Sequence, residues 1–314
     1  MAPAILIVGA TGNTGRSTVE ILSGFLKTSS VLSSHRIIAL TRSSNGSVAQ
    51  ELAKLPGVEV IEKNWVEITP DWLRDNEVAR AFIASQPQVA QFTEESTFLV
   101  AALQAAVKYV VRISTTAPNV RPDCVAFYAR SHWALEQLLS SPEFEPLQWT
   151  SLQANSFSQL YLQTSAEFVK QYRRTGKQGT LRIVGSADAP LGIIDPYDVG
   201  VVAAHLLAQK DPTPHNKAKY ILNGPEDISG HQVVEMVEQH IGTKVENVIF
   251  KDTTFADVYA NNSPGPKNII LTLKASVEVI WQGLCSASTT SKQVLELAAP
   301  KITPAEVFKR MLEE

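Results

Sequence analysis

The sequence is poor in cysteine and has no long apolar run. Only 2 of its 314 residues are cysteines, Cys124 and Cys285, and neither is surrounded by other residues at metal-ligand spacing. Two distant cysteines in a chain of this length predict free thiols in a reducing compartment, so we expect neither a disulfide framework nor a metal site. No stretch approaches the ~18 apolar residues of a membrane span. A strand-like run begins at residue 4, which leaves no room for a signal peptide, and we expect a soluble, cytoplasmic protein.

The sequence also lacks an excess of either charge. The 28 Lys and Arg nearly balance the 31 Asp and Glu, and the net charge is −3. Such a chain offers no basic surface for nucleic acid or an anionic membrane. The only basic cluster, residues 170–177, is explained most simply as a helix C-terminus whose cations complement the helix dipole. With 44% hydrophobic residues the chain can bury one large or two modest cores. We therefore expect a globular protein that binds a small molecule and neither nucleic acid nor membrane.

The most informative stretch is residues 4–15, AILIVGATGNTG. Five consecutive apolar residues predict a parallel strand buried on both faces. Three glycines then precede a helix-like segment, residues 17–27, and the spacing G-x-x-G-x-x-G allows a tight turn and a close approach of backbone to a pyrophosphate. Free N–H groups in the first helical turn favour an anion there. The residues expected to contact a dinucleotide are Gly9, Thr11, Gly12, Asn13, Thr14 and Gly15. The alternative is a structural turn without a ligand.

A second apolar run, residues 35–41, ends at Arg42 and Ser43. In dinucleotide folds the end of the second strand faces the adenosine ribose. An acidic residue there binds the 2′-hydroxyl of NAD, whereas an arginine accommodates the 2′-phosphate of NADP. No Asp or Glu occurs between Ile21 and Gln50. Arg42 and Ser43 therefore favour NADP(H), and the alternative is an arginine in an ordinary solvated loop.

Further strand-like runs alternate with helix-like segments, at residues 58–61, 79–84, 109–113 and 147–153. This alternation predicts a doubly wound parallel α/β sheet whose ligands lie beyond the carboxyl ends of the strands. Ser85, Gln86 and Pro87 follow one such strand and are expected beside the cofactor. We expect an NADP-binding Rossmann domain in residues 1–154, with later segments near 180–225 contributing, and a smaller, mainly substrate-binding α/β domain in residues 155–314.

The second half predicts a different order of elements. We expect a strand at 180–184, a helix from Pro196, and a helix at 230–241 that begins with a Ser229-x-x-Gln232 capping box and ends at Gly242. Apolar residues at helical spacing across 269–284 predict a core-facing helix. Residues 261–266 and 286–291 are predicted loops, the second of them a candidate mobile segment.

Several stretches together resemble the NmrA-like family of atypical short-chain dehydrogenases/reductases. They are the glycine loop, the Ala-Leu-Thr-Arg strand end at 39–42, and residues 108–114, 148–157, 194–199, 220–226 and 302–308. The resemblance implies a Rossmann domain, NADP(H) binding and a small C-terminal domain that closes the substrate cleft. The family contains both reductases and non-catalytic redox-sensing regulators.

The helix expected around Tyr128 departs from the short-chain dehydrogenase pattern. Those enzymes use a Tyr-x-x-x-Lys pair, in which the lysine lowers the pKa of the tyrosine and the tyrosine protonates the substrate. Here the spacing is kept as Tyr128-x-x-x-His132, and no lysine occurs between Tyr109 and Val169. Glu136, one turn further, is spaced to orient or charge His132. Three alternatives stay open. Tyr128 and His132 act as acid and ribose anchor, or the hydride acceptor needs no protein acid, or the site only senses NADPH/NADP⁺. A helix histidine that only packs or meets solvent is a further alternative for His132.

The remaining site candidates come from the resemblance. Ser114 stands at a strand end where short-chain dehydrogenases keep a carbonyl-orienting serine, and an ordinary polar strand end is the alternative. Asn155, Phe157 and Tyr161 are implied to line the substrate cleft, with a purely core role as the alternative for the two aromatic residues. We expect an NADPH-dependent oxidoreductase that passes hydride to a small hydrophobic molecule. The alternative is a non-catalytic NADP(H)-sensing regulator that binds a partner. A monomer and a homodimer are both compatible with the sequence.

Overall fold

The apolar run Ala4–Val8 forms β1, and all five of its residues are buried because helices cover both faces of this strand. The computed structural model describes residues 2–28 and 31–313. Seven of the described strands form one parallel sheet in the order β3-β2-β1-β4-β5-β6-β8. The others in this sheet are β2 (Arg36–Thr41), β3 (Val58–Glu62), β4 (Val78–Ile83), β5 (Tyr109–Ile113), β6 (Gln148–Ala154) and β8 (Ala218–Leu222). The direction of winding reverses between β1 and β4, where ligands bind in open α/β sheets.

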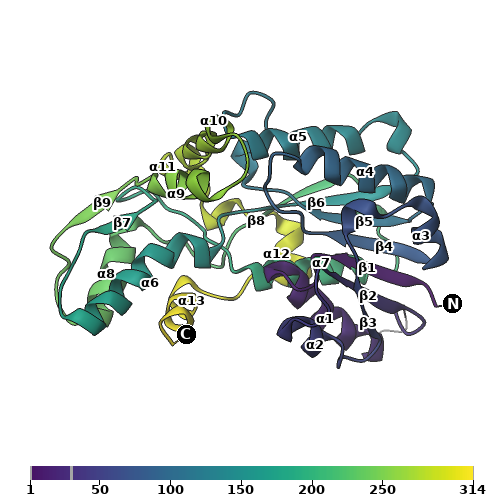
Figure 1. Cartoon of the computed structure of the whole chain (residues 1–314), viewed down its shortest axis with the longest axis horizontal. Helices are drawn as coiled ribbons and strands as arrows, with labels where there is room; N and C mark the ends of the chain where they lie inside the picture. Colours follow the sequence, from purple (N-terminus) through teal and green to yellow (C-terminus); the bar gives the residue numbers. More distant parts are fainter. Residues whose placement is uncertain (1, 29–30, 314) are drawn as a thin grey trace.

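Helices pack against both faces of the sheet (Figure 1). One face is covered by α3 (Pro70–Asp75), α4 (Gln91–Gln104) and α5 (Phe127–Leu139), which share an apolar core with the strands. The opposite face is covered by α1 (Asn13–Thr28), α2 (Ser47–Leu52), α7 (Pro196–Leu207) and α12 (Lys292–Ala298), around a second core. The predicted doubly wound Rossmann-like α/β fold is confirmed.

α1 and α7 approach each other very closely at Gly200. A Cβ atom at this position would lie 1.9 Å from Ser17 Oγ and 2.4 Å from the carbonyl oxygen of Thr14. The Thr18 hydroxyl donates to the carbonyl of Gly200 at 3.3 Å and to that of Thr14 at 2.8 Å. Only glycine fits this contact, because any Cβ would overlap with atoms of α1. α7 therefore packs directly against the first turns of α1, behind the glycine loop.

A smaller lobe follows β6 and has its own apolar core. Its helices and strands are α6 (Ser158–Thr175), β7 (Leu181–Ile183), α8 (Gly230–Ile241), β9 (Val248–Phe250), α9 (Thr254–Asn262), α10 (Lys267–Ile270), α11 (Glu278–Trp281) and α13 (Pro304–Glu313). β7 and β9 pair in parallel as a ribbon of their own. The chain leaves this lobe twice, first to add α7 and β8 to the sheet layer and then to add α12 (Figure 1). The sheet layer and the smaller lobe are therefore interleaved along the chain.

The predicted helix signals in the smaller lobe are confirmed. Ser229 and Gln232 form the capping box of α8, and Gly242 ends that helix with a φ of 73°. The stripe across 269–284 is not one helix, because α10 and α11 flank a 3-10 helix, Leu271–Val277. This segment still packs inward, with Val277 and Ile280 in the lobe core.

The predicted loop at 286–291 contains a short 3-10 turn, Ala287–Thr289. The side-chain amide of Asn223 donates to the hydroxyls of Thr289 and Thr290 at 3.0 and 3.1 Å. The Ser291 hydroxyl accepts from the backbone N–H of Ile221 at 2.8 Å. These bonds fasten the segment to the end of β8, so the structure gives no support to its being a mobile segment.

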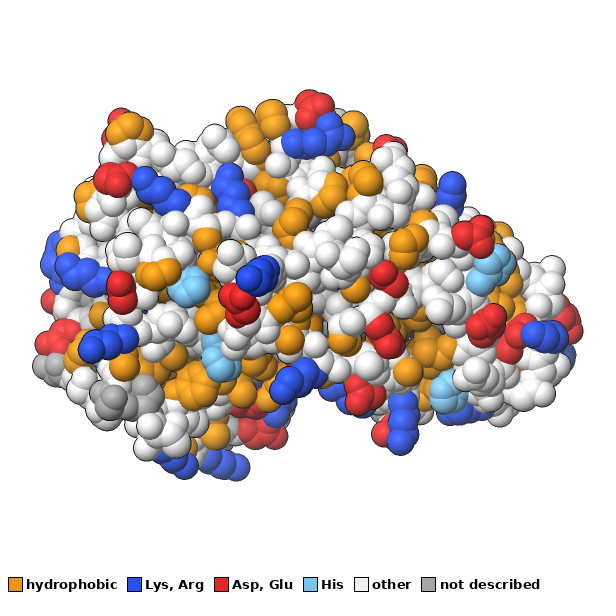
Figure 2. Space-filling view, turned by 180° about the vertical axis from the view of Figure 1, so that it is seen from behind, with side chains coloured by type: hydrophobic (Ala, Val, Ile, Leu, Met, Phe, Trp, Pro, Cys, Tyr) orange, Lys and Arg blue, Asp and Glu red, His pale blue; other side chains and the backbone are white. Residues whose placement is uncertain are grey.

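The surface shows no large region of one charge on the side seen in Figure 2, where Lys and Arg side chains alternate with Asp and Glu. Across the described ranges, every helix is too short or too polar to traverse a bilayer.

Candidate functional site

The glycine loop folds tightly against its own backbone. Gly9 has a φ of +78°, and a Cβ on Gly15 would lie 2.1 Å from the carbonyl oxygen of Gly9. Gly12 differs, because a Cβ there would meet only the Gly9 carbonyl oxygen, at 3.2 Å. Gly9 and Gly15 are therefore required by the turn itself, whereas a Cβ at Gly12 would meet a single backbone oxygen and no other atom within 4 Å. Glycine at position 12 thus leaves room for a ligand to approach the backbone.

Backbone N–H groups without a backbone acceptor in the described part of the chain follow Gly12 at the start of α1. Gly12 N–H donates to the Gly9 carbonyl at 2.9 Å, and Arg16 N–H donates to the Gly12 carbonyl at 3.0 Å. Among the described residues, no backbone carbonyl accepts from the N–H groups of Asn13, Thr14 or Gly15. These groups lie in the first turn of α1, where the helix dipole is positive. The loop is thus built to receive an anion, and a pyrophosphate fits it.

The end of β2 stands beside this loop. Ala10 N–H donates to the Leu40 carbonyl at 3.2 Å, and the hydroxyls of Thr11 and Thr41 lie 3.5 Å apart. Arg42 and Ser43 follow and are exposed. No ion pair or side-chain hydrogen bond links Arg42 to the part of the chain that the structure describes. Its guanidinium is therefore available to a phosphate.

An acidic residue that the sequence analysis did not place here lies on the neighbouring strand. Glu62 ends β3, and its carboxylate accepts from the N–H and hydroxyl of Ser44 at 2.8 and 2.7 Å. These hydrogen bonds lower the pKa of Glu62 below its usual value. The carboxylate therefore holds the Ser44 turn, just beyond Arg42. Only the pairing of β2 with β3 could reveal this contact.

The segment Ser85–Gln86–Pro87 follows β4 at the point where the winding reverses. Gln86 and Pro87 are exposed, whereas Ser85 is half-buried. The Ser85 hydroxyl donates to Glu95 Oε2 on α4 at 2.7 Å. Ser85 is thereby connected to a group of buried charged residues beneath this edge of the sheet.

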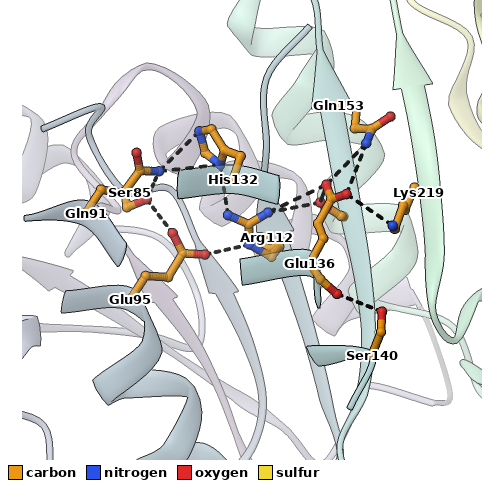
Figure 3. Close-up of polar contacts among 10 residues, drawn as sticks. Ser85, Gln91, Glu95, Arg112, His132, Glu136, Ser140, Gln153 and Lys219 are labelled. Carbon is orange, nitrogen blue, oxygen red and sulfur yellow. Dashed lines mark hydrogen bonds and ion pairs between the residues drawn. The ribbon is translucent and has the colours of Figure 1, made fainter. Parts of the chain in front are cut away.

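This group, the buried charge set, consists of Glu95, Arg112, His132 and Glu136 (Figure 3). Arg112, on β5, is fully buried and donates from Nε to Glu95 Oε1 at 2.6 Å. Its terminal nitrogens contact His132 Nδ1 at 2.9 Å and donate to Ser151 Oγ at 3.1 Å. Glu136 Oε1 lies 3.9 Å from Arg112, and Lys219 Nζ lies 3.4 Å from Glu136 Oε2. The two carboxylates are thus balanced by two cations, the buried Arg112 and the partly exposed Lys219.

The environment of His132 keeps its imidazole neutral. Burial, and secondly the charge of Arg112, lower the pKa of His132 well below its usual value. Because Arg112 can only donate, His132 Nδ1 must accept, and the proton of the neutral ring is on Nε2. Gln91 Nε2 lies 3.1 Å from that nitrogen, and Gln91 Oε1 has no partner among the described residues, so this amide turned over gives the N–H an acceptor. His132 therefore does not supply the positive charge that a lysine would supply at this position.

Tyr128 and Ser114 are the other two candidate catalytic residues. The Tyr128 hydroxyl lies 3.5 Å from Thr115 Oγ1, so α5 brings it against the end of β5. Burial raises its pKa above the usual value, and its ring meets His132 edge-on at 6.2 Å. Ser114 Oγ is buried and has no hydrogen-bond partner among the described residues. The structure thus gathers Tyr128 and His132 on one helix face, close to the strand end that carries Ser114.

The three residues implied for the substrate cleft have different surroundings. Asn155 Nδ2 donates to the carbonyls of Gly192 and Cys285, both at 3.0 Å, which ties β6 to the smaller lobe. Phe157 pairs with Ile194 through an isolated bridge. Tyr161 is buried, its hydroxyl is packed against Gly185, and burial raises its pKa. All three therefore have structural contacts, and only Asn155 lines the cavity described next.

A cavity of about 290 Å³ opens beyond the carboxyl ends of β6 and β8. It is lined by Thr116, Ala117, Pro118, Gln153, Asn155, Ile221, Asn223, Leu284, Cys285 and Thr289. None of these side chains carries a charge, and burial raises the pKa of the Cys285 thiol to about 12. The cavity lies at the same edge of the sheet as the glycine loop. β6 is three strands from β1, or roughly 14 Å at ~4.8 Å per strand.

The model of the NmrA-like family matches residues 1–299. The chain belongs to the NmrA-like family. No curated protein matches it.

Solved structures share the fold of this NmrA-like chain over its whole length. An NADPH-dependent quinone oxidoreductase from Escherichia coli, complexed with NADPH, is 22% identical with a TM-score of 0.71, covering 98% of this chain and 99% of that one. A triphenylmethane reductase from Citrobacter sp., complexed with NADP(H), is 18% identical with a TM-score of 0.71, covering 98% and 100%. NmrA, a negative transcriptional regulator, is 15% identical with a TM-score of 0.71, covering 100% and 96%. Two reductases and a regulator therefore have the same architecture.

Proposed function

We propose that this NmrA-like protein is an NADP(H)-dependent oxidoreductase that reduces a small, hydrophobic organic molecule by hydride transfer. The observation that carries the proposal is the uncharged cavity, which shares one sheet edge with an anion-ready glycine loop. The named activities of the two structurally similar reductases support it. A protein that only had to bind a nucleotide would not need this second space.

The residues present fit the cofactor. Asn13, Thr14 and Gly15 would hold the pyrophosphate through their free N–H groups, with Thr11 beside them. Arg42 and Ser43 would hold the 2′-phosphate, and Ser85, Gln86 and Pro87 would border the rest of the dinucleotide. When bound, the nicotinamide supplies the hydride. The role of the chain is then to orient the two molecules and to exclude water.

None of the three candidate catalytic side chains readily gives a proton to a substrate. Tyr128 stays protonated because its pKa is raised, so it donates a hydrogen bond but loses its proton reluctantly. His132 is neutral and engaged with Arg112. Ser114 is available only as a hydrogen-bond donor to a substrate oxygen. These properties favour a conjugated or cationic acceptor, such as a quinone, whose reduced form takes its proton from water.

The same observations favour a second candidate, an NADP(H)-sensing regulator that binds a partner and catalyses nothing. A neutral, buried His132 in place of lysine is what a chemically silent site would contain. The structural similarity to the transcriptional regulator NmrA is in accord with it.

A fluorescence titration with NADPH, and with NADH as the control, tests the cofactor first. We expect tight, NADPH-selective binding, followed by NADPH oxidation when quinones, enones, imines or ketones are added. If the protein binds NADPH selectively but oxidises it with none of these acceptors, the result would favour the regulator over the oxidoreductase. If neither NADPH nor NADH binds, both candidate functions are contradicted.

Gly12→Leu provides a matched control for the titration. A Cβ at this position meets only the Gly9 carbonyl oxygen, so the fold should tolerate the change, whereas a bulky side chain on the loop should block the nucleotide; binding should be lost while circular dichroism is unchanged. Retained binding would show that the loop does not hold the nucleotide.

A further inference from the structure

The side-chain amide of Gln153 is held in one orientation in the cavity wall, and its oxygen has no hydrogen-bond partner among the described residues. Gln153, near the end of β6, is only 8% exposed and lines the cavity. Its Nε2 donates to both carboxylate oxygens of Glu136, each at 3.2 Å. Its Oε1 has no hydrogen-bond partner among the described residues, and Figure 3 shows this oxygen turned away from Glu136. The cavity therefore contains an acceptor without a donor.

The chemistry of Glu136 fixes the orientation of this amide. Besides Gln153, the carboxylate accepts from the Ser151 hydroxyl at 2.7 Å and faces the positive charges of Lys219 and Arg112. A carboxylate among donors only accepts, so the NH₂ group of Gln153 must face it. Turning the amide over would place two acceptors against each other beneath the cavity. Oε1 is therefore held away from Glu136 by the buried charge set.

The other amides of the cavity wall are already satisfied. Asn155 Nδ2 donates to Asn223 Oδ1 at 2.8 Å in addition to its two carbonyl partners, and Asn155 Oδ1 accepts from Ser156 N–H at 2.8 Å. Asn223 Nδ2 donates to Thr289 and Thr290. Of the remaining lining residues, only Thr116 has a side-chain hydroxyl without a hydrogen-bond partner among the described residues, and a hydroxyl can donate or accept. Among the side chains that line the cavity, Gln153 Oε1 is thus the one amide oxygen without a donor in the described part of the chain.

We propose that Gln153 determines specificity in this cavity, which takes a neutral, largely apolar molecule whose O–H or N–H donates to Gln153 Oε1. The proposal rests on the proposed function in taking the cavity as the substrate site. A phenolic or enolic O–H on a conjugated carbonyl compound satisfies both requirements, because the carbonyl accepts hydride and the hydroxyl meets the amide. Anions are disfavoured, because no cation lines the cavity.

The cavity should bind a ligand that carries the O–H or N–H donor much more tightly than an otherwise similar ligand that lacks it. A ligand without the donor would leave Oε1 desolvated and unpaired, which costs more than a hydrogen bond exchanged with water gains. We expect a loss of at least about tenfold in affinity when the donor is removed.

The test uses the full chain and two probes, 1-naphthol and its methyl ether, each titrated by tryptophan fluorescence with and without saturating NADPH. We expect the naphthol to bind at least about tenfold more tightly than the ether. In Gln153→Met, which keeps the side-chain length, this ratio should fall to near one. The matched control Thr116→Val changes another polar group of the same wall and should keep the ratio.

Gln153→Met removes the Nε2 donor that contacts both oxygens of Glu136, so this variant could fold poorly. The wild-type ratio decides the outcome even in that case. Equal binding of naphthol and ether to the wild type would overturn the role of Gln153. Binding of NADPH with no binding of either probe would overturn the proposal and leave the cofactor site standing. A failure of NADPH to bind while the naphthol binds selectively would contradict the proposed function alone.

Discussion

Arg42 stands exposed at the end of β2 with no described partner, although an arginine on a folded surface usually finds one. If it binds the 2′-phosphate, Arg42→Ala should weaken NADPH binding by roughly 10- to 100-fold, the range for a hydrogen bond to a charged group. NADH has no 2′-phosphate, so its affinity should be almost unchanged. Parallel titrations with both nucleotides measure the difference. Arg174→Ala, near the far end of α6, is the matched control and should change neither affinity. Equal losses for NADPH and NADH would remove Arg42 from the 2′-phosphate site.

His132 makes the stability of the protein depend on pH. Its pKa in the folded state lies well below 6.5, whereas the unfolded chain has the ordinary value. The unfolded state therefore binds more protons as the pH falls below about 6.5, and the free energy of unfolding falls by at most about 1.4 kcal/mol per pH unit. Above that pH, His132 is neutral in both states, and the free energy of unfolding no longer depends on its titration. Denaturant unfolding at pH 7.5 and 5.5 measures this dependence.

The variant His132→Gln should have a smaller pH dependence than the wild type. His35, His205, His215 and His240 also have lowered pKa values and remain in the variant, so the comparison isolates His132. An unchanged slope in His132→Gln would mean that His132 is protonated in the folded state.

At the residue scale the sequence indicated which side chains share a helix face, but not which side chains from other elements contact them. Tyr128, His132 and Glu136 share one helix, and their spacing alone indicated that they share a face. Arg112, whose charge helps to lower the pKa of His132, comes from β5, and Gln91, which contacts its ring, comes from α4. Such contacts depend on the tertiary fold, and no local pattern contains them.

Among the elements, α1 and α7 form a contact that admits no extra atom. Gly200→Ala would place a methyl group within 2.4 Å of both Ser17 Oγ and the Thr14 carbonyl oxygen. We expect a loss of about 1–3 kcal/mol in the free energy of unfolding, together with weaker nucleotide binding, because the first turns of α1 must shift. Denaturant unfolding and the NADPH titration measure the two effects.

Gly24→Ala supplies the contrast on α1 itself. No atom lies within 4 Å of a Cβ at Gly24, so this change should stabilise the protein by about 0.5–1 kcal/mol and leave nucleotide binding alone. If Gly200→Ala behaved like Gly24→Ala, the close contact between the two helices would be wrong.

The elements were predictable where a local signal sets their ends. Apolar runs mark β1, β2 and β5, and the capping box and Gly242 define α8. α9 was not predicted, because its exposed Phe255, Val258 and Tyr259 give no strong two-sided pattern. The break between α10 and α11 was missed for a related reason. A 3-10 helix keeps apolar residues on nearly the same face as an α-helix would, so spacing alone does not distinguish them.

At the scale of the whole molecule, the smaller lobe depends on its last helix. Phe308 on α13 is fully buried in the lobe core. Phe308→Ala should lower the free energy of unfolding by about 3–5 kcal/mol. Hydrogen exchange should show the first loss of amide protection in α6 and α8, with β1 and β4 still protected. Leu295→Ala is the control, since Leu295 is 52% exposed and its loss should cost no more than about 0.5 kcal/mol. Simultaneous loss of protection throughout would mean that the two parts unfold as one unit.

The C-terminal segment also fastens the helix that supports the nucleotide loop. The backbone N–H groups of Lys301 and Ile302 both donate to the carboxylate of Asp198 at 2.9 Å, and Arg310 pairs with Asp195 at the start of α7. α7 in turn meets α1 at Gly200, behind the glycine loop. For protein engineering, this makes the last residues a poor place for an affinity tag or a truncation. A change made there would be transmitted through two helices to the site where the chain is proposed to bind its cofactor.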